Sequence, residues 1–596
     1  MAGEPRRDEA PPVGRAPKRI GVFVCHCGGN ISDYVDVAQV AAEVAGEQGV
    51  VVSKNHMFTC SDAAQQEITE DVRSQGLEAL VIASCSPKLH QLTFRTLADR
   101  AGINPYEYVQ VNLREQCSWA HTDDRQGATA KGTSLVKAGV AKAALARPLH
   151  PLRVETAPRV LVIGAGVAGL RAALALADLG LEVHVAEREE VVGGAVRRWA
   201  ALAPAGRAGA DIVREILEQV AAHPRITLHL GTELASKSGS IGDFHLTLEG
   251  RDGTRTRLHA GAIVVATGFD HYRPMPGEFG YGLPGVVTLP EFHDRADLDG
   301  DTFTFEGRPI RSVVFVYCVG SRQAESEACP EPNTWCSRYC CKATTHIGAR
   351  VAAQEERGGR PVAQYHLYRD MRTYGHGEVL YERARRGGAL FVRFADDAPP
   401  VVEEDGDRLL VRLRDELTAG EELEIPADLV VLVTGMVPRE NGRLVDILKV
   451  PVGKDGFFNE IHLKLRPVET VIDGVFLAGT AQGPKSMAES VGSALAAVSK
   501  AGALLKKGFV DLEPLIARVD PDRCTWCGEC LAACPYSAVQ KISWGDKEIA
   551  YIVGSQCKGE GACVPVCPHD ALDIEGYTDA QITAMIDAGA PARVGA

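Results

Sequence analysis

The stretch 159–194 constrains the fold more than any other part of the chain, because it joins an apolar strand, a glycine-rich turn, an Ala- and Leu-rich helix and a second strand. Such a βαβ unit binds dinucleotides: Gly164 permits the tight turn, Gly166 lets backbone N–H groups approach a pyrophosphate, and Gly169 lets helix and strand pack closely. Glu187 ends the second strand 23 residues after Gly164, near the spacing of about 20 expected for a carboxylate that binds a ribose hydroxyl. A glycine turn without a ligand is disfavoured because every part is present.

Length and charge exclude several classes of function. At 596 residues the chain is long enough for about three or four domains. Its net charge of −14 argues against a nucleic-acid partner, which needs clustered Lys and Arg. No apolar run approaches the roughly 18 residues of a membrane helix. Residues 1–18 lack an apolar segment, so we expect a disordered tail there and not a signal peptide.

The cysteines indicate metal binding. The chain has 17 of them, an odd number, in three bunches separated by long stretches without cysteine. A framework of disulfides does not have this distribution, whereas thiolates kept for metal in a reducing cytoplasm do. A cytoplasmic location is therefore expected.

The first bunch consists of Cys25, Cys27, Cys60, Cys85 and Cys117. Two apolar strands, RIGVFVC and ALVIASC, each end on a cysteine. Because strand ends in an α/β layer meet at one edge, these thiols could converge there. Buried free thiols are an equal alternative at this point, because cysteine is among the most buried residues.

Three later segments return to the glycine-rich unit. Strand and turn GAIVVATGFD (261–270) is one, and DLVVLVTGM (428–436) is another. Segment 473–501 resembles the C-terminal FAD motif of disulfide-reductase-like flavoproteins, although Thr480 stands where Asp is usual. FAD is therefore the predicted cofactor. Its candidate contacts are Gly164, Gly166, Gly169, Glu187, Gly194, Ala266, Thr267, Gly268, Gly479, Thr480 and Lys485.

The insert of about 130 residues between the two FAD-binding parts lies where a two-dinucleotide flavoprotein carries its NAD(P)H domain. Its first strand, RSVVFVYC, runs into Cys318-Val-Gly-Ser-Arg and not into a second glycine fingerprint. Cys336, Cys340 and Cys341 follow as CSRYCC, and with Cys318 they can hold one iron–sulfur cluster. A zinc site is the alternative, because four thiolates also suit zinc. Cys329 stays unassigned.

The third bunch has the spacing of a bacterial ferredoxin. Cys524, Cys527, Cys530 and Cys534, followed by Pro, match the C-x2-C-x2-C-x3-C-P run, whose fourth cysteine binds the other cluster. The partner run supplies Cys557, Cys563 and Cys567, with Glu560 where its second cysteine is expected. One complete cubane is predicted on Cys524, Cys527, Cys530 and Cys567. The other site has Cys534, Cys557 and Cys563, which leaves three outcomes: Glu560 as a ligand, a three-iron cluster, or a labile site.

Longer strings identify a family. GVFVCHCGGNI, VIASCSPKLHQLTFR, GINPYEYVQVNLREQCSW, CVGSR with CSRYCC, MRTYGHGEVLYERARRGG and LAGTAQGPK, with the ferredoxin tail, resemble the A-type subunits of heterodisulfide reductases over nearly everything after residue 18. The resemblance implies a flavin-carrying electron hub of a multi-subunit complex. It also implies a cluster on Cys27, Cys60, Cys85 and Cys117, with the choice between Cys25 and Cys27 open, and the insert cluster beside the flavin.

Two departures from the family stand out. Longer members carry an extra two-cluster ferredoxin module between the first βαβ unit and the ATG strand, whereas residues 195–262 contain no cysteine here. Longer members also tend to have Lys five residues after the CC pair, where this chain has His346. A proton donor to the reduced flavin is the functional interpretation of His346, and an ordinary helix histidine is an equal alternative.

The expected fold class is α/β, a two-domain disulfide-reductase-like FAD flavoprotein core with an N-terminal α/β cluster domain and a C-terminal two-cluster ferredoxin domain. The predicted limits are a tail (1–18), the cluster domain (19–150), FAD-binding parts (155–300 and 429–508), the insert (301–428), the ferredoxin domain (512–576) and a terminal helix or tail (577–596).

The expected function is electron transfer, with FAD and about four [4Fe–4S] clusters. The resemblance implies partners of two kinds, heterodisulfide-reductase-like catalytic subunits and an electron-input dehydrogenase or hydrogenase, with ferredoxin and a homodimeric core as further expectations. It also suggests flavin-based electron bifurcation, which the missing ferredoxin module puts in question. The alternatives are a self-contained NAD(P)H-dependent flavoenzyme, which the missing second fingerprint disfavours, and a non-catalytic relay or scaffold.

Overall fold

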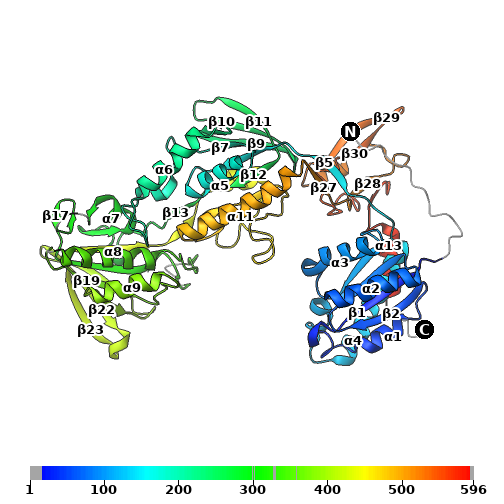
Figure 1. The fold of residues 1–596 in the computed structure, drawn as a ribbon, viewed down its shortest axis with the longest axis horizontal. Helices are drawn as coiled ribbons and strands as arrows, with labels where there is room; N and C mark the ends of the chain where they lie inside the picture. The colour runs from blue at the N-terminus through cyan, green and yellow to red at the C-terminus, as the bar shows by residue number, and fades with distance from the viewer. Residues whose placement is uncertain (1–16, 299, 301, 326–329, 358, 591–596) are drawn as a thin grey trace. The chain divides into compact units, whose positions relative to one another are not determined.

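The computed structural model describes residues 17–590 except 299, 301, 326–329 and 358, so most of the predicted tail and Cys329 lie outside the described residues. The chain divides into two compact units (Figure 1). The terminal unit joins Met1–Arg153 to Asp511–Ala596, and the central unit is Val154–Val510. No helix in the described part of the chain is long and apolar enough to cross a membrane.

The N-terminal part of the terminal unit is a four-stranded parallel sheet in the order β2-β1-β3-β4. Its core strands β1 and β3 are apolar and buried along their whole length, as expected of a parallel sheet with helices on both faces. The carboxyl ends of the strands therefore meet at one edge. The elements are β1 (Ile20–Cys25), α1 (Val37–Val44), β2 (Val50–His56), α2 (Asp62–Gln75), β3 (Ala79–Ser84), α3 (Pro87–Ala101), β4 (Tyr108–Asn112) and α4 (Arg125–Leu145).

The C-terminal part of the terminal unit is small and short-stranded. It contains β28 (Ala517–Val519) paired with β31 (Leu572–Ile574), the hairpin β29 (Val539–Trp544) and β30 (Lys547–Ile552), and α12 (Glu529–Ala533). The last helix, α13 (Asp579–Gly589), packs on α4. Lys142 of α4 is buried there, with its Nζ 3.0 Å from the centroid of the Tyr577 ring.

The central unit begins with a five-stranded parallel sheet in the order β26-β12-β6-β7-β8. Helices α5 and α11 pack together over it, and their alanines, with those of the strands, form a close-packed core (Figure 1). An antiparallel sheet of β9, β10 and β11 adjoins it. The elements are β6 (Arg159–Ile163), α5 (Val167–Asp178), β7 (Glu182–Ala186), α6 (Gly209–Ala222), β8 (Ile226–His229), β9 (Thr232–Ser240), β10 (Asp243–Gly250), β11 (Arg255–Ala260), β12 (Ala262–Val265), β26 (Val475–Leu477) and α11 (Met487–Lys506).

The insert of the central unit is a second parallel sheet, in the order β14-β24-β18-β19-β20. Strand β18 is buried along its whole length and leads to Cys318. Helix α8 follows the CSRYCC segment and packs against α9. The elements are β14 (Val286–Thr288), β18 (Ser312–Val319), α8 (Cys340–Glu356), β19 (Ala363–Tyr368), α9 (Gly377–Arg386), β20 (Leu390–Arg393) and β24 (Leu429–Thr434), with an antiparallel sheet of β21 (Val401–Asp405), β22 (Arg408–Asp415) and β23 (Glu421–Ala427).

Candidate functional site

The glycine turn after β6 has one closed side and one open side. A Cβ on Gly169 would lie 1.9 Å from the carbonyl oxygen of Gly164, and a Cβ on Gly164 would lie 2.4 Å from that of Ala266. Gly164 also has a φ of 105°. At Gly166 no atom lies within 4 Å of the Cβ position, beside the start of α5. The turn thus packs tightly on one side and leaves room for a phosphate at the helix N-terminus.

Glu187, one residue after β7, is held in place by the backbone. Its Oε2 accepts a hydrogen bond of 2.7 Å from the N–H of Ala165, and its Oε1 accepts one of 3.0 Å from the N–H of Glu189. The side chain is buried and lines the cavity described next. A carboxylate fixed beside the glycine turn is well placed to accept hydrogen bonds from a ribose.

A cavity of about 1230 Å³ lies beside the turn, between the first sheet of the central unit and the insert. This volume is larger than that of most small-molecule pockets, roughly 300–1000 Å³, and suits an extended dinucleotide. Thr267 Oγ1 is buried without a hydrogen-bond partner in the described structure, so a bound ligand would satisfy it. Nine of the predicted contacts line the cavity: Gly164, Gly166, Glu187, Gly194, Ala266, Thr267, Gly268, Thr480 and Lys485.

The other two predicted contacts lie behind the cavity wall. Gly169 packs against the turn, and a Cβ on Gly479 would lie 2.7 Å from Cβ of Ala168. Both glycines therefore permit close packing and do not touch the open space. Gly479 brings the end of β26 against α5, which shapes the wall from which Thr480 lines the cavity.

The insert supplies a wall that the sequence analysis did not single out. Tyr339, Lys342 and Tyr374 line the cavity, with Lys342 Nζ 3.6 Å from the centroid of the Tyr374 ring. The Tyr374 hydroxyl donates to Glu489 Oε1 at 3.2 Å, near the start of α11. Residues 339, 342 and 343 share one face of α8, a spacing that could have been noticed. The approach of Tyr374 depends on tertiary packing.

His346 lies on α8 but is not among the residues that line the cavity. It is buried, and neither ring nitrogen has a hydrogen-bond partner in the described structure. Burial, with the nearby charges of Arg350 and Arg383, lowers the pKa of His346 to about 4. The ring would be neutral near pH 7, which works against donation of a proton to a flavin. That role stays a prediction.

The insert thiols are gathered around the end of β18. Cys318, Cys340 and Cys341 are buried, and the electrostatic influences on Cys340 come from Cys341, Cys318 and Cys336. Burial raises the pKa of the Cys318 thiol, while Arg369 and Arg322 lower it. These two guanidinium groups hydrogen-bond the Cys318 sulfur.

The loop after β18 leaves no open turn for a second dinucleotide. Cys318 and Gly320 have φ values of 61° and 66°. A Cβ on Gly320 would lie 1.9 Å from the Tyr272 ring, so an aromatic side chain covers the glycine. The sheet of an NAD(P)H domain is therefore present, while its phosphate-binding turn is replaced by a thiol-bearing loop.

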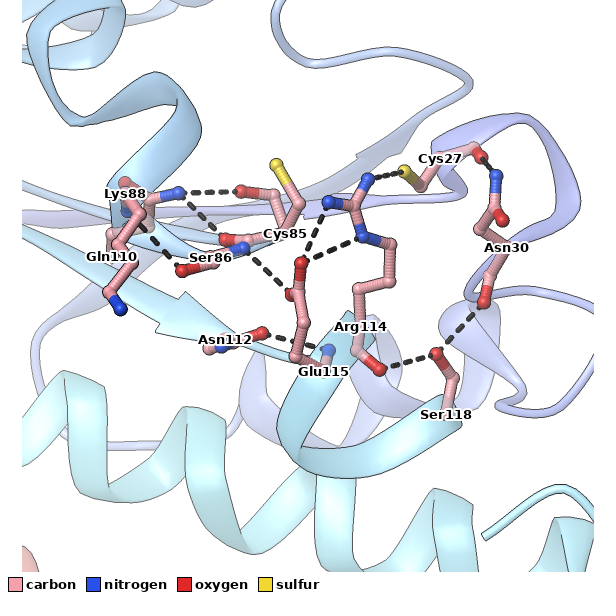
Figure 2. A network of polar contacts seen from close by, with 11 residues as sticks. Cys27, Asn30, Cys85, Ser86, Lys88, Gln110, Asn112, Arg114, Glu115 and Ser118 are labelled. Carbon is pink, nitrogen blue, oxygen red and sulfur yellow. Dashed lines mark hydrogen bonds and ion pairs between the residues drawn. The ribbon is translucent and has the colours of Figure 1, made fainter. Parts of the chain in front are cut away.

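The N-terminal thiols surround Arg114 at the carboxyl edge of the sheet. Figure 2 shows Arg114 between Cys27 and Cys85, with Nη1 3.5 Å from Cys27 Sγ. Glu115 pairs with Arg114 at 2.7 Å and accepts a hydrogen bond of 2.9 Å from the N–H of Ser86. This ion pair thus fixes the loop after β3 against the loop after β4.

Cys25 belongs to the same group. Its sulfur accepts hydrogen bonds from the N–H groups of Cys27 at 3.2 Å and Thr59 at 3.5 Å. The raised pKa of Cys60 results first from burial and then from the nearby Cys25, with a smaller contribution from Cys27. Burial also raises the pKa of Cys85, to about 11. The structure therefore gathers Cys25, Cys27, Cys60 and Cys85.

Cys117 points away from that group. Its thiol is buried and donates to the carbonyl oxygen of Ala128 on α4 at 2.9 Å. A Cβ on Gly132 of the same helix would lie 3.7 Å from its sulfur. The predicted set of Cys27, Cys60, Cys85 and Cys117 is thus not the set that the structure brings together.

The ferredoxin cysteines form two groups in the predicted crossed pattern. Cys524, Cys527, Cys530 and Cys567 line one small cavity. In the second group, burial raises the pKa of Cys563 to about 11, with further contributions from Cys557 and Cys534. Glu560 accepts a hydrogen bond from the hydroxyl of Tyr536, a residue whose pKa is also influenced by Cys534. The carboxylate of Glu560 therefore lies beside the three-thiol group.

Comparisons with known proteins agree with this arrangement. Residues 158–309 match the family model of pyridine nucleotide-disulphide oxidoreductases, and residues 517–574 match that of the 4Fe-4S dicluster domain. These matches confirm the predicted fold class of the flavoprotein core and the C-terminal domain. They also support a flavin and 4Fe-4S clusters as cofactors.

Curated relatives, all of them A-type iron-sulfur subunits, match nearly the whole chain. One of those of the CoB--CoM heterodisulfide reductase of Methanopyrus kandleri is 34% identical over 88% of this chain and 91% of its own length. That of the CoB--CoM heterodisulfide reductase of Methanocaldococcus jannaschii is 33% identical over 96% and 98%. That of the H(2):CoB-CoM heterodisulfide,ferredoxin reductase of Methanothermobacter thermautotrophicus is 33% identical over 87% and 90%.

Proposed function

Because the chain belongs to the family of A-type iron–sulfur subunits of heterodisulfide reductases, which are oxidoreductases, we propose that it binds FAD and distributes electrons to iron–sulfur clusters within a heterodisulfide-reductase-like complex. One observation carries this proposal. The cavity has the dinucleotide turn on one wall and α8 on the other, and α8 begins with Cys340 and Cys341. A flavin bound there would lie beside the insert thiols.

The chain's own residues position the cofactor. The N–H groups after Gly166 face the pyrophosphate, Glu187 accepts from the ribose, and Thr267 Oγ1 gains a partner. Lys342, on the wall of α8, brings a positive charge close to the start of α11. FAD supplies two-electron chemistry, which clusters can accept in single steps. The protein's contribution is to hold the two kinds of centre close together and to set their potentials.

We assign four sites for clusters, which agrees with the expected number. The insert site uses Cys318, Cys336, Cys340 and Cys341, and the complete ferredoxin site uses Cys524, Cys527, Cys530 and Cys567. The N-terminal site uses Cys25 in place of Cys117, because Cys25 lies with Cys27, Cys60 and Cys85 and already accepts two N–H groups.

At the fourth site we assign Glu560 as the ligand that completes Cys534, Cys557 and Cys563. The Tyr536 hydroxyl bonds one carboxylate oxygen, Oε1, and leaves the other for a metal ion. Outer hydrogen bonds of this kind commonly orient metal ligands. A carboxylate ligand makes this cluster atypical, with a shifted potential and one exchangeable iron.

The partners are proposed from the relatives, whose names include H(2), formate and ferredoxin. The chain would receive electrons from a dehydrogenase, hydrogenase or ferredoxin and pass them to heterodisulfide-reductase-like catalytic subunits. Bifurcation is proposed for the same flavin. In that case its two one-electron potentials are crossed, so the flavin titrates as a single two-electron step. A homodimeric core and a cytoplasmic location stay predictions.

The test is an anaerobic titration of the purified full-length chain. Acid extraction should release FAD, identified by chromatography against FMN. NADH and NADPH should leave the flavin oxidised, because the loop at Gly320 has no phosphate-binding turn, whereas reduced ferredoxin should bleach it. Prompt bleaching by NADH or NADPH would favour a self-contained NAD(P)H flavoenzyme. A flavin that stays oxidised at potentials that reduce every cluster would favour a scaffold.

A further inference from the structure

The outward face of the β10–β11 hairpin carries two histidines and an aspartate. His245 of β10 lies directly opposite His259 of β11 in the antiparallel register. Asp243 precedes His245 by two residues and therefore lies on the same face, while Phe244 and Leu246 point into the core. The ladder of the sheet thus fixes three potential ligands side by side.

The three side chains point toward one another. His259 Nε2 lies 2.6 Å from Asp243 Oδ1, and His245 Nε2 lies 3.4 Å from the same oxygen. The imidazole rings are stacked, with centroids 4.9 Å apart and planes 9° from parallel. One ligand atom from each residue lies within 4.8 Å of the other two. The donors are therefore close to the spacing that one ion requires, with no change in the backbone.

A simple ion pair does not explain the arrangement well. One protonated histidine is enough to pair with Asp243, and two protonated rings in a stack would repel each other. A divalent cation replaces both protons and draws the three donor atoms together. Imidazole nitrogen with carboxylate oxygen suits Zn²⁺, Ni²⁺, Co²⁺ or Cu²⁺, whereas Mg²⁺ and Ca²⁺ prefer oxygen alone.

The surroundings leave the donors accessible. The side chains of His245, His259 and Asp243 are 61%, 48% and 49% exposed, so the remaining coordination positions are open to water. Arg159 comes near, but it donates to the carbonyl oxygen of His259 and pairs with Glu182. That guanidinium therefore does not occupy the donor atoms.

We propose that Asp243, His245 and His259 form a binding site for a divalent transition-metal ion on the β10–β11 hairpin. The site is separate from the cavity and from the cysteines, and it stands whether or not the proposed function does. A bound ion would link β10 to β11 by their side chains.

The test is equilibrium dialysis of the full-length protein, purified anaerobically with its cofactors in place, against buffered Ni²⁺, with bound nickel counted by mass spectrometry. The unaltered chain should bind one equivalent that the double variant H245A/H259A lacks. D243N should weaken binding of the same equivalent by roughly 10- to 100-fold. The matched control is H223A, which alters a histidine 3.7 Å from Asp178 with no second histidine facing it. It should keep the equivalent.

Equal nickel binding by the unaltered chain and H245A/H259A overturns the proposal, as does an equal loss in H223A. The thermal midpoint without metal shows whether each variant is folded. If the double variant does not fold, H259Q alone decides in the same way, because it removes one donor from an exposed position and keeps a polar side chain there.

Discussion

The insert thiols and the ferredoxin thiols differ in burial and in the groups that bond them. Cys318 and Cys341 are buried, and guanidinium groups of Arg322 and Arg369 hydrogen-bond Cys318. In the ferredoxin domain Cys527 is exposed and several other thiols are half-buried. Their hydrogen bonds come from backbone N–H groups, as at Cys524, which accepts from Ala550 at 3.4 Å.

The difference separates two ways to set a redox potential. Backbone N–H groups are fixed by the fold and carry only partial charges, so sequence change alters them little. Guanidinium groups carry a full charge in a buried site where screening is weak, so one substitution changes the field at the thiols. The insert site is thus the one whose potential can be adjusted by side chains, and it lies beside the proposed flavin.

The largest expected effect comes from removing an insert thiol. C318S should lower the iron content by about four atoms per chain, because one cubane loses a ligand. FAD content should change little, since Cys318 does not line the cavity. Iron, acid-labile sulfide and FAD are measured on the same anaerobic sample. Full iron retention in C318S would remove the insert site from the comparison.

The N-terminal site adds a third environment, in which Arg114 bonds Cys27. C25S should lose a cluster, whereas C117S should keep it, because the Cys117 thiol bonds the carbonyl oxygen of Ala128. The two variants form a matched pair, one Cys to Ser change at each of two buried positions. Iron content with the EPR spectrum of the reduced protein tells them apart. The reverse result would restore Cys117 as the ligand.

Glu560 tests the ferredoxin side. E560C should supply a fourth thiolate and convert the atypical cluster into an ordinary [4Fe–4S] cluster, visible by EPR as a second S = 1/2 cubane signal. Y536F should leave iron content unchanged and make one iron exchange faster, because the carboxylate loses its orienting hydrogen bond. Two ordinary cubane signals in the unaltered chain would contradict the assignment of Glu560.

The local features were predictable because short-range geometry determines them. Spacing alone predicted the turn at Gly164 and Gly169, where each close approach involves backbone of the same unit or the neighbouring strand. The spacing of Cys524, Cys527 and Cys530 likewise predicted the group that, with Cys567, lines one small cavity.

Side-chain direction was not predictable in the same way. Cys117 lies in a wide helical turn, Arg114–Ser118, which directs its thiol toward α4. The sequence does not reveal this turn. Lys342 and Tyr374 meet at the cavity only because α8 packs beside the segment that follows β19. His346 shares the helix with Lys342, yet it is not exposed to the cavity.

The smallest effect, and the sharpest test of the comparison, is R369Q. Removing a positive charge near the thiols disfavours the reduced and more negative cluster, so the potential of the insert cluster should fall. Loss of one charged hydrogen bond costs on the order of 1 kcal/mol, which corresponds to roughly 40 mV for one electron. Potentiometric titration followed by EPR measures the change.

Two variants distinguish charge from structure, because Arg369 also donates to the carbonyl oxygens of Ser321 and Arg322 at 2.6 and 2.7 Å. R369K keeps the charge and should keep most of the potential, even if the loop is less stable. R412Q removes a charge of the same insert that pairs with Glu403 and Glu424, away from the thiols, and should leave the potential unchanged. If R369Q and R412Q shift it equally, net charge sets the potential, and the guanidinium groups at Cys318 have no special part.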